Sequence, residues 1–261
     1  MKPVEPKVFI IGESQNDNEG FRAYLKHVGA PDWNSDAGTA VELLPEEYGR
    51  LCYRSWEPGL NPNVTKVREG SEPYLAHILE VRHGSVLEHP FVNFIFADVS
   101  RVFTHELVRH RVGVAVSQES LRFVRVDDLP FWFPEWARQD EELMTQCKII
   151  LQTLEVHQYW MARRFGLDKK GVNFEEKKHK TSFMRRFLPQ GMATTIGWSA
   201  NVRTIRWVIE TRTDPGAEEE IRFVFGKVAK MMQERYPNLF KDYEVEMVDG
   251  LPWYKTQNSK V

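Results

Sequence analysis

The segment from 139 to 165 restricts the fold most, because its apolar residues follow a helical repeat. They recur at alternating steps of three and four, which is the spacing of one face of an α-helix. The pattern predicts a long amphipathic helix of about 27 residues, too long for a fold made only of strands. The residues that carry it are Leu143, Cys147, Ile150, Leu154, His157, Met161 and Phe165.

Strand-type and helical segments alternate along the rest of the chain. Runs rich in Val, Ile and Phe predict a buried strand over 7–14, a second strand over 90–98 and β-structure within 112–127. Apolar spacing and capping residues predict further helices. These cover 41–53, 71–83 with Ser71 as its cap, about 101–110 with Ser100 as its cap, 192–212 and 217–236. We expect connections or loops over 31–39, 128–137 and 169–180, and an irregular tail from Asp249. The mixture predicts an α/β or α+β fold, a mixed sheet flanked by long helices in a single domain.

Composition narrows the class of protein. The 261 residues hold 35 Lys and Arg against 37 Asp and Glu, a net charge of −2 that excludes a uniformly basic nucleic-acid binder. The two cysteines, Cys52 and Cys147, form no metal-binding or disulfide pattern, so we expect core packing and a reducing, cytoplasmic location. No apolar run approaches the length of a membrane span, and no membrane association is expected.

Several motifs for nucleotide, acyl or metal chemistry are missing. The sequence has no GxGxxG, no GxxxxGK[ST] and no GxSxG element. His105 and His110 resemble a zinc-protease pair but lie five residues apart, about 140° around a helix, which does not suit one metal ion. We therefore predict no metal site.

Three clusters of polar residues remain as candidate sites. Arg109-His110-Arg111 is followed by Ser117, Gln118, Ser120 and Arg122, a set that suits a phosphate group, although composition alone favours a solvated basic turn. The segment from His83 to His89 is either a functional or a capping loop. Downstream, Asn201, Arg203 and Arg212 share a predicted helix that either binds a polar ligand or lies in a salt-bridged surface.

Taken together, these segments resemble the flavin-dependent thymidylate synthase family (the ThyX type). The family signature is Arg-His-Arg, seven residues and then Ser, matched by Arg109 to Arg111 and Ser120. Three further elements match in the same order. They are His83, Ser85, Glu88 and His89 upstream, Arg185 with Leu188-Pro189 downstream, and Asn201 and Arg203 followed by Arg212.

The chain departs from the family pattern at five points. Eight residues separate Arg111 from Ser120, one more than the signature has, and a bulge within 112–116 would absorb the extra residue. Phe123 replaces a common Tyr, Glu106 stands where Gln is frequent, and Trp207 replaces an Asn that often contacts the flavin. The stretch 124–180 exceeds the family core, so we expect one synthase domain over 1–248 with a helical insertion at about 124–180, and a tail over 249–261.

The resemblance implies FAD-dependent methylation of dUMP to dTMP, with methylenetetrahydrofolate as carbon donor and NADPH as reductant. By position, Arg212 is the implied catalytic residue, because it would contact the uracil ring. The implied FAD-binding residues are His83, Ser85, Glu88, Arg109, His110, Arg111, Asn201, Arg203 and Trp207. The implied dUMP-binding residues are Glu106, Arg109, Gln118, Ser120, Arg122, Arg185 and Arg212.

The resemblance also implies a homotetramer whose subunits share active sites. Two other functions stay open at this point. One is a related flavoenzyme that methylates another pyrimidine nucleotide, for which Glu106 would accept a bond from an exocyclic amine. The other, remote, is a nucleic-acid-binding module that uses the arginines and the lysine-rich segment 169–180, with strongly salt-dependent binding.

Overall fold

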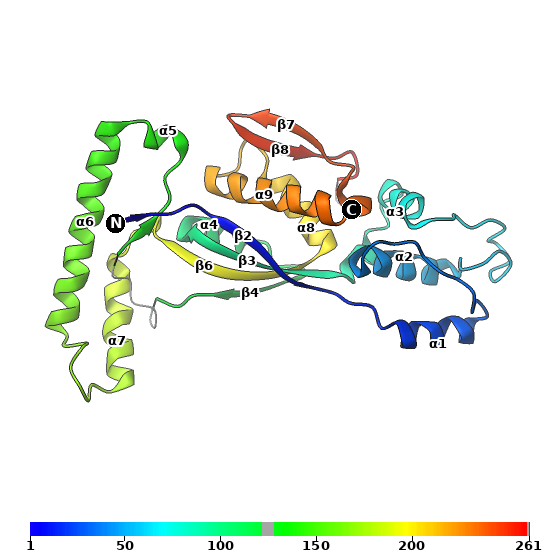
Figure 1. Cartoon of the computed structure of the whole chain (residues 1–261), viewed down its shortest axis with the longest axis horizontal. Coiled ribbons are helices and arrows are strands. Elements are labelled where there is room, and N and C mark those ends of the chain that lie inside the picture. The colour runs from blue at the N-terminus through cyan, green and yellow to red at the C-terminus, as the bar shows by residue number, and fades with distance from the viewer. Residues whose placement is uncertain (122–127, 260) are drawn as a thin grey trace. The chain divides into compact units, whose positions relative to one another are not determined.

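The computed structural model of the chain describes residues 1–121, 128–259 and 261 (Figure 1). Its helices are α1 (Asn18–Val28), α2 (Ala40–Tyr53), α3 (Ser71–Glu80), α4 (Arg101–Leu107), α5 (Glu135–Arg138), α6 (Glu141–Arg164), α7 (Phe174–Met184), α8 (Val202–Arg212), α9 (Glu219–Arg235) and α10 (Pro237–Phe240), with short 3₁₀ turns η1 (Gly84–Glu88) and η2 (Arg185–Phe187). Its strands are β1 (Lys2–Pro3), β2 (Lys7–Glu13), β3 (Phe91–Ser100), β4 (Val114–Gln118), β5 (Pro130–Phe131), β6 (Ala193–Asn201), β7 (Glu244–Val248) and β8 (Leu251–Lys255).

The mixed α/β class predicted from the sequence is confirmed. Strands β2, β3, β6 and β4 form a four-stranded sheet in that order, and two pairs of strands, β1 with β5 and β7 with β8, form smaller sheets. The described residues form two compact units. Unit 1 comprises 1–9, 95–109 and 116–197, and unit 2 comprises 10–94, 110–115 and 198–261, apart from the residues outside the description.

Strand β6 corrects the prediction of one helix over 192–212. Residues 193–201 alternate between buried and half-buried positions, and only 202–212 are helical. The sequence ATTIGWSAN contains β-branched and aromatic residues with a repeat of two, which fits a pleated strand with one covered face. Asn201 ends the strand and caps α8, because its side chain accepts a hydrogen bond from the backbone N–H of Thr204.

Strand β2 was expected to be buried, and its exposure corrects that expectation. It lies at the edge of the four-stranded sheet, and its residues alternate in exposure. Phe9 is 48 % exposed and Ile11 62 % exposed, so one face of this strand lacks cover within the described residues.

Unit 1 contains the predicted long helix, α6, which packs beside α7 (Figure 1). The buried face differs slightly from the predicted one, since Ile150 and His157 are exposed whereas Leu151 and Gln158 are buried. Gln158 donates to the backbone carbonyl of Met184, which ties the two helices together. One cluster joins Met161, Ala162, Leu167 and Met184, and a second joins Leu129, Phe133, Leu151 and Met192.

The charged segment 169–180 was predicted to be a loop, and α7 overturns that prediction in part. Residues 174–184 form a helix in which every residue except Met184 is at least partly exposed. Lys and Glu are good helix formers, and the ion pair between Lys180 and Glu176 has the i,i+4 spacing that supports a helix.

Unit 2 has its core around α8 and α9. Trp198 of β6 packs against Phe94 of β3 and Phe225 of α9. The guanidinium of Arg206, 2 % exposed, makes two hydrogen bonds to the carboxylate of Asp242, at 2.8 and 2.7 Å. Burial of such a charge is tolerated because the Asp242 carboxylate pairs with it.

The C-terminal tail is ordered, which corrects the prediction of an irregular segment. Residues 251–255 form β8, antiparallel to β7, and this hairpin packs on α9 (Figure 1). Tyr254 is buried and its backbone N–H donates to the hydroxyl of Thr213. The placement of domain boundaries stays a prediction.

Two predicted helix ends also shift. Helix α3 begins at Ser71 with Gly70 as its cap and ends at Glu80, so Ser71 does not cap it. Helix α4 ends at Leu107, three residues before the predicted end, although Ser100 caps it as expected by accepting from Phe103 N–H. Within the described residues, every helix is too short or too polar to cross a membrane.

Candidate functional site

The candidate residues fall in both units, and each group is considered by itself. The unit 2 group comprises His83, Ser85, Glu88, His110, Arg111, Asn201, Arg203, Trp207 and Arg212. The unit 1 group comprises Glu106, Arg109, Gln118, Ser120 and Arg185. Arg122 and Phe123 lie outside the described residues.

In unit 2, the fold brings Arg212, at the end of α8, to the histidine of the Arg-His-Arg segment. Arg212 Nε donates to His110 Nε2 at 2.7 Å, although 102 residues separate them in the chain. The ring of Trp207, five residues earlier on α8, meets the His110 ring edge to face, with centroids 4.9 Å apart. His110 is buried, whereas Trp207 is 43 % exposed and so presents ring surface to a ligand.

Asn201 connects the same segment to the start of α8. Its backbone N–H donates to the carbonyl of Gly113 at 3.0 Å, and the hydroxyl of Thr204 donates to the carbonyl of Val112 at 2.8 Å. Gly113 has a φ of 67°, a conformation that favours glycine, in a turn just before β4. This turn lies within 112–116, where the extra residue of the spacer was expected to be absorbed.

Glu88 and Arg203, both implied FAD-binding residues, are in contact with each other. The Arg203 guanidinium pairs with the Glu88 carboxylate, and both side chains are about half exposed. Gly84 lies beneath Arg203, since a Cβ at this position would come within 2.8 Å of Arg203 Nε. A glycine is therefore needed for the guanidinium to reach Glu88.

His83 and Arg111 keep hydrogen-bonding capacity for a ligand. His83 Nδ1 is buried and has no hydrogen-bond partner among the described residues, and the ring lies against Tyr53 with centroids 5.7 Å apart. The exposed Arg111 side chain makes no hydrogen bond or ion pair within the described part of the chain. Imidazole and guanidinium groups with unused hydrogen-bonding capacity suit an anionic or polar cofactor.

In unit 1, Glu106 and Arg109 form an ion pair across one helical turn, with 3.5 Å between Oε1 and the guanidinium. Gln118, at the end of β4, donates to the hydroxyl of Thr104 on α4, which links the two elements that carry the predicted nucleotide ligands. Ser120 is half-buried two residues further on.

Arg101 is a candidate that the sequence reasoning missed. Burial and the positive charge of Arg185 lower the pKa of Arg101, so the two guanidiniums lie close enough to repel each other. Arg101 also occupies the first position of α4, where the helix dipole disfavours a cation. This position at the start of a helix was the sequence signal that could have identified Arg101. Two neighbouring cations favour binding of a phosphate group.

The cysteines were expected to pack in the core, and one does not. Cys52 is exposed, whereas Cys147 is partly buried against the cluster around Leu151.

A cavity of about 400 Å³ adjoins Arg212, bordered by Glu210, Thr211, Asp214, Gly216 and Ala217. In the described residues, no three His, Cys, Asp or Glu side chains are grouped for metal binding.

Comparison with known proteins agrees with the motifs. The family model for thymidylate synthase complementing protein matches residues 38–238. A flavin-dependent thymidylate synthase of Corynebacterium diphtheriae is 32 % identical over 226 residues, covering 84 % of this chain and 86 % of the relative. One from Mycobacterium marinum is 32 % identical over 238 residues, covering 87 % and 90 %.

The fold has a counterpart among solved structures. A UMP/dUMP methylase, PolB, from Streptomyces cacaoi bound with 5-Br UMP superposes with a TM-score of 0.61 over 92 % of this chain and 95 % of that one, at 15 % identity. The same protein bound with 5-Br dUMP gives the same score. With the family model matched over most of its length and relatives above 30 % identity, the chain belongs to the flavin-dependent thymidylate synthase family of enzymes.

Proposed function

We propose that this enzyme methylates dUMP to dTMP, with FAD as cofactor, methylenetetrahydrofolate as carbon donor and NADPH as reductant. The observation that carries the proposal is the bond between Arg212 and His110, because it joins two motifs that lie far apart in the sequence. The names of the relatives support a flavin and thymidylate synthesis.

The unit 2 group fits FAD by its chemistry. Arg111 and Arg203 supply cationic donors for a pyrophosphate, and the open Nδ1 of His83 supplies a further hydrogen-bonding atom. Ser85, Glu88 and Asn201 complete the unit 2 set, with Trp207 offering ring surface in place of an amide. Arg109, a residue of unit 1, is also among the proposed FAD ligands. When bound, the flavin supplies the redox chemistry that side chains lack.

The nucleotide is held, in this proposal, by Gln118, Ser120, Arg122, Arg185 and Glu106, with Arg101 added from the structure. Arg185 and Arg101 face the phosphate, which relieves the repulsion between them. Arg212 contacts the uracil ring, where its charge stabilises negative charge that develops on the pyrimidine. Its bond to His110 fixes the direction of the guanidinium before substrate arrives.

The active form is proposed to be a cytoplasmic homotetramer with shared active sites. Light scattering coupled to size exclusion tests this directly. A tetrameric mass that retains flavin is expected, and a monomer that binds FAD with full activity contradicts the proposal.

The experiment that tests the function measures formation of dTMP from dUMP by the flavin-loaded enzyme, with each cosubstrate omitted in turn. Omission of methylenetetrahydrofolate, of reductant or of flavin is expected to abolish the product. Turnover that persists without added or bound flavin contradicts the proposal.

A second candidate is a relative with a different pyrimidine nucleotide as substrate. The solved structure of similar fold is that of a UMP/dUMP methylase. Glu106, an anion where the family often has Gln, favours a base with an exocyclic amine. A panel of dUMP, UMP and dCMP separates these. We expect the highest kcat/KM for dUMP, and a preference for either other nucleotide favours the second candidate.

A further inference from the structure

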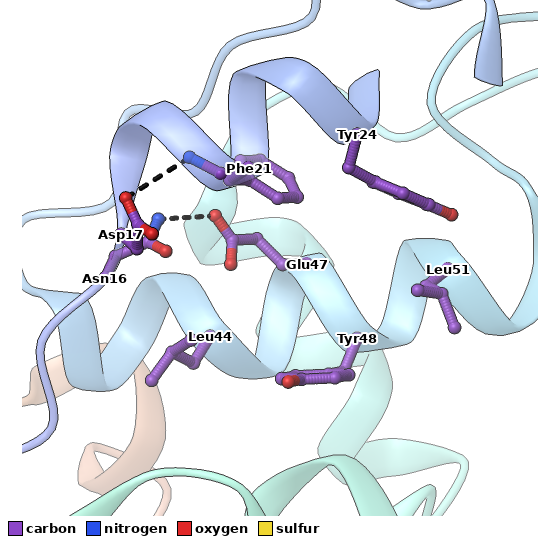
Figure 2. Close-up of a pocket in the computed structure, with 9 residues that line it drawn as sticks. Asn16, Asp17, Phe21, Tyr24, Leu44, Glu47, Tyr48 and Leu51 are labelled. Atoms are coloured by element: carbon purple, nitrogen blue, oxygen red, sulfur yellow. Dashed lines mark hydrogen bonds between the residues drawn. The ribbon is translucent and has the colours of Figure 1, made fainter. Parts of the chain in front are cut away.

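A pocket in unit 2 has no part in the function proposed above. It is a cavity of about 310 Å³ between α1 and α2, a size typical of small-molecule sites (Figure 2). Phe21 and Tyr24 of α1 and Leu44, Tyr48 and Leu51 of α2 supply its apolar lining, and Asn16, Asp17, Gly20 and Glu47 supply its polar lining.

Glu47 is the residue that gives the pocket a chemical preference. Its side chain points from α2 toward α1, where the amide of Asn16 donates to Oε1 at 2.7 Å (Figure 2). This is the one hydrogen bond of the carboxylate within the described residues, although Glu47 is only 5 % exposed. A carboxylate can accept about four hydrogen bonds, so most of this capacity is unused.

No cation of the described chain neutralises Glu47. Arg50, the arginine nearest to Glu47 in the sequence, pairs with Glu46 instead, to which it donates from Nε and Nη2 at 3.0 and 2.8 Å. Burial and the charge of Glu46 raise the pKa of Glu47 to about 7. A buried carboxylate without a counter-charge is unfavourable, and a positively charged ligand removes that cost.

Aromatic rings make up much of the remaining lining. Phe21, Tyr24 and Tyr48 come from two helices, and the Tyr48 ring is held by parallel stacking on His89, with centroids 3.5 Å apart. Aromatic faces attract organic cations, and the attraction grows when water is excluded. A metal ion is a poor fit, because such ions need several oxygen ligands and the lining is mostly carbon.

We propose that this pocket binds a small organic cation with an aromatic or planar body and a charged N–H group. The N–H group donates hydrogen bonds to Glu47, and the ring packs among Phe21, Tyr24 and Tyr48. The site is separate from the flavin and nucleotide residues, although His89 belongs to the upstream motif and stacks on Tyr48. The proposal does not depend on which pyrimidine nucleotide the enzyme uses.

Benzamidine is the probe that tests this, because its amidinium forms paired N–H bonds to a carboxylate and its ring is flat. Calorimetric titration of the flavin-loaded, full-length protein compares it with benzamide, the neutral analogue. We expect saturable binding of benzamidine that saturating dUMP leaves unchanged, with benzamide at least about tenfold weaker. Equal binding of the two compounds overturns the proposal.

Two variants locate the binding. Glu47→Gln keeps the size of the side chain and the acceptor for Asn16, and it is expected to weaken benzamidine at least about tenfold. Glu19→Gln makes the same change of charge on the exposed side of α1, outside the pocket, and is expected to leave the affinity within about twofold. Matching affinities in the two variants overturn the proposal.

Leu51→Trp provides a test that leaves Glu47 intact. Leu51 is 43 % exposed at the pocket, so a larger side chain narrows the opening without entering the core. Weaker binding of benzamidine by at least about fivefold is expected. Unchanged affinity in this variant shows that benzamidine binds elsewhere and overturns the proposal.

Discussion

Arg212 Nε donates to His110 Nε2 across 2.7 Å, so the imidazole serves as the acceptor in this bond. An imidazole nitrogen accepts only when it carries no proton, which places the ring proton on Nδ1. The bond therefore fixes the guanidinium of Arg212, at the end of α8, against the Arg-His-Arg segment. Arg212 keeps its full positive charge.

The first prediction concerns Arg212. Replacement by Ala is expected to leave flavin bound and to lower kcat at least about a hundredfold, because the charge that stabilises the pyrimidine is lost. Lys at this position keeps the charge but not the Nε bond to His110, and an intermediate kcat is expected. Steady-state kinetics and the flavin-to-protein absorbance ratio measure both effects.

Arg203→Ala is the contrasting control. It removes the partner of Glu88 within the proposed FAD set, so it is expected to lower flavin content more than kcat per bound flavin. If Arg212→Ala loses flavin and Arg203→Ala does not, the roles of the two arginines are assigned wrongly.

The second prediction concerns the pair of guanidiniums in unit 1. Arg101→Ala and Arg185→Ala are each expected to raise KM for dUMP about tenfold or more with a smaller change in kcat, because each removes a proposed phosphate ligand. Initial rates at several ionic strengths measure this. Arg186→Ala, an exposed neighbour on η2 at a position that the motif leaves unspecified, is the matched control. An equal rise in KM for that variant shows that only general surface charge matters.

The third prediction concerns the turn at Gly113. An added Cβ must adopt a φ of 67° and would lie within 2.8 Å of Thr204 Oγ1 and against the Asn201 amide. Gly113→Ala is expected to lower the free energy of unfolding by about 2–4 kcal/mol, measured by urea denaturation.

Gly171→Ala separates the two causes. Gly171 has a φ of 85° and no atom within 4 Å of an added Cβ, so this variant carries the backbone cost alone, about 1 kcal/mol. Equal losses in the two variants mean that the contact with Asn201 and Thr204 contributes nothing.

The fourth prediction is a dependence of stability on pH. Folded Glu47 holds its proton up to about pH 7, whereas the unfolded chain releases it near 4.5, so folding loses stability as pH rises between these values. Relative to Glu47→Gln, the wild type is expected to lose at most about 3 kcal/mol between pH 4.5 and 8. Urea denaturation of both proteins across this range measures the difference. A difference that is constant with pH, or that changes in the opposite direction, contradicts the assignment.

Local patterns predicted much of the fold. The three-four spacing located α6, helical spacing located α2, and an apolar run located β3, each within a few residues. Residues 193–201 were misassigned to a helix because this strand, with its repeat of two, runs directly into α8. The helical pattern of 202–212 was therefore extended over the strand. The cap at Asn201 marks the real boundary.

The site was predicted less completely than the fold. The order of the motifs identified His110 and Arg212 as candidates, and these two residues are in contact. Arg101 was missed because its importance comes from Arg185, which lies 84 residues away in the chain and adjoins it only after folding. The same reason applies to Glu47, whose buried position beside Asn16 depends on the packing of α1 against α2.

The central claim is that arginines and histidine from distant motifs meet at a flavin and a pyrimidine nucleotide. The visible absorption spectrum of the purified protein, recorded before and after addition of dUMP, tests it most directly. The account predicts flavin bands that dUMP perturbs in the wild type and leaves unperturbed, or much less perturbed, in Arg212→Ala. A colourless protein that does not take up added FAD would contradict it.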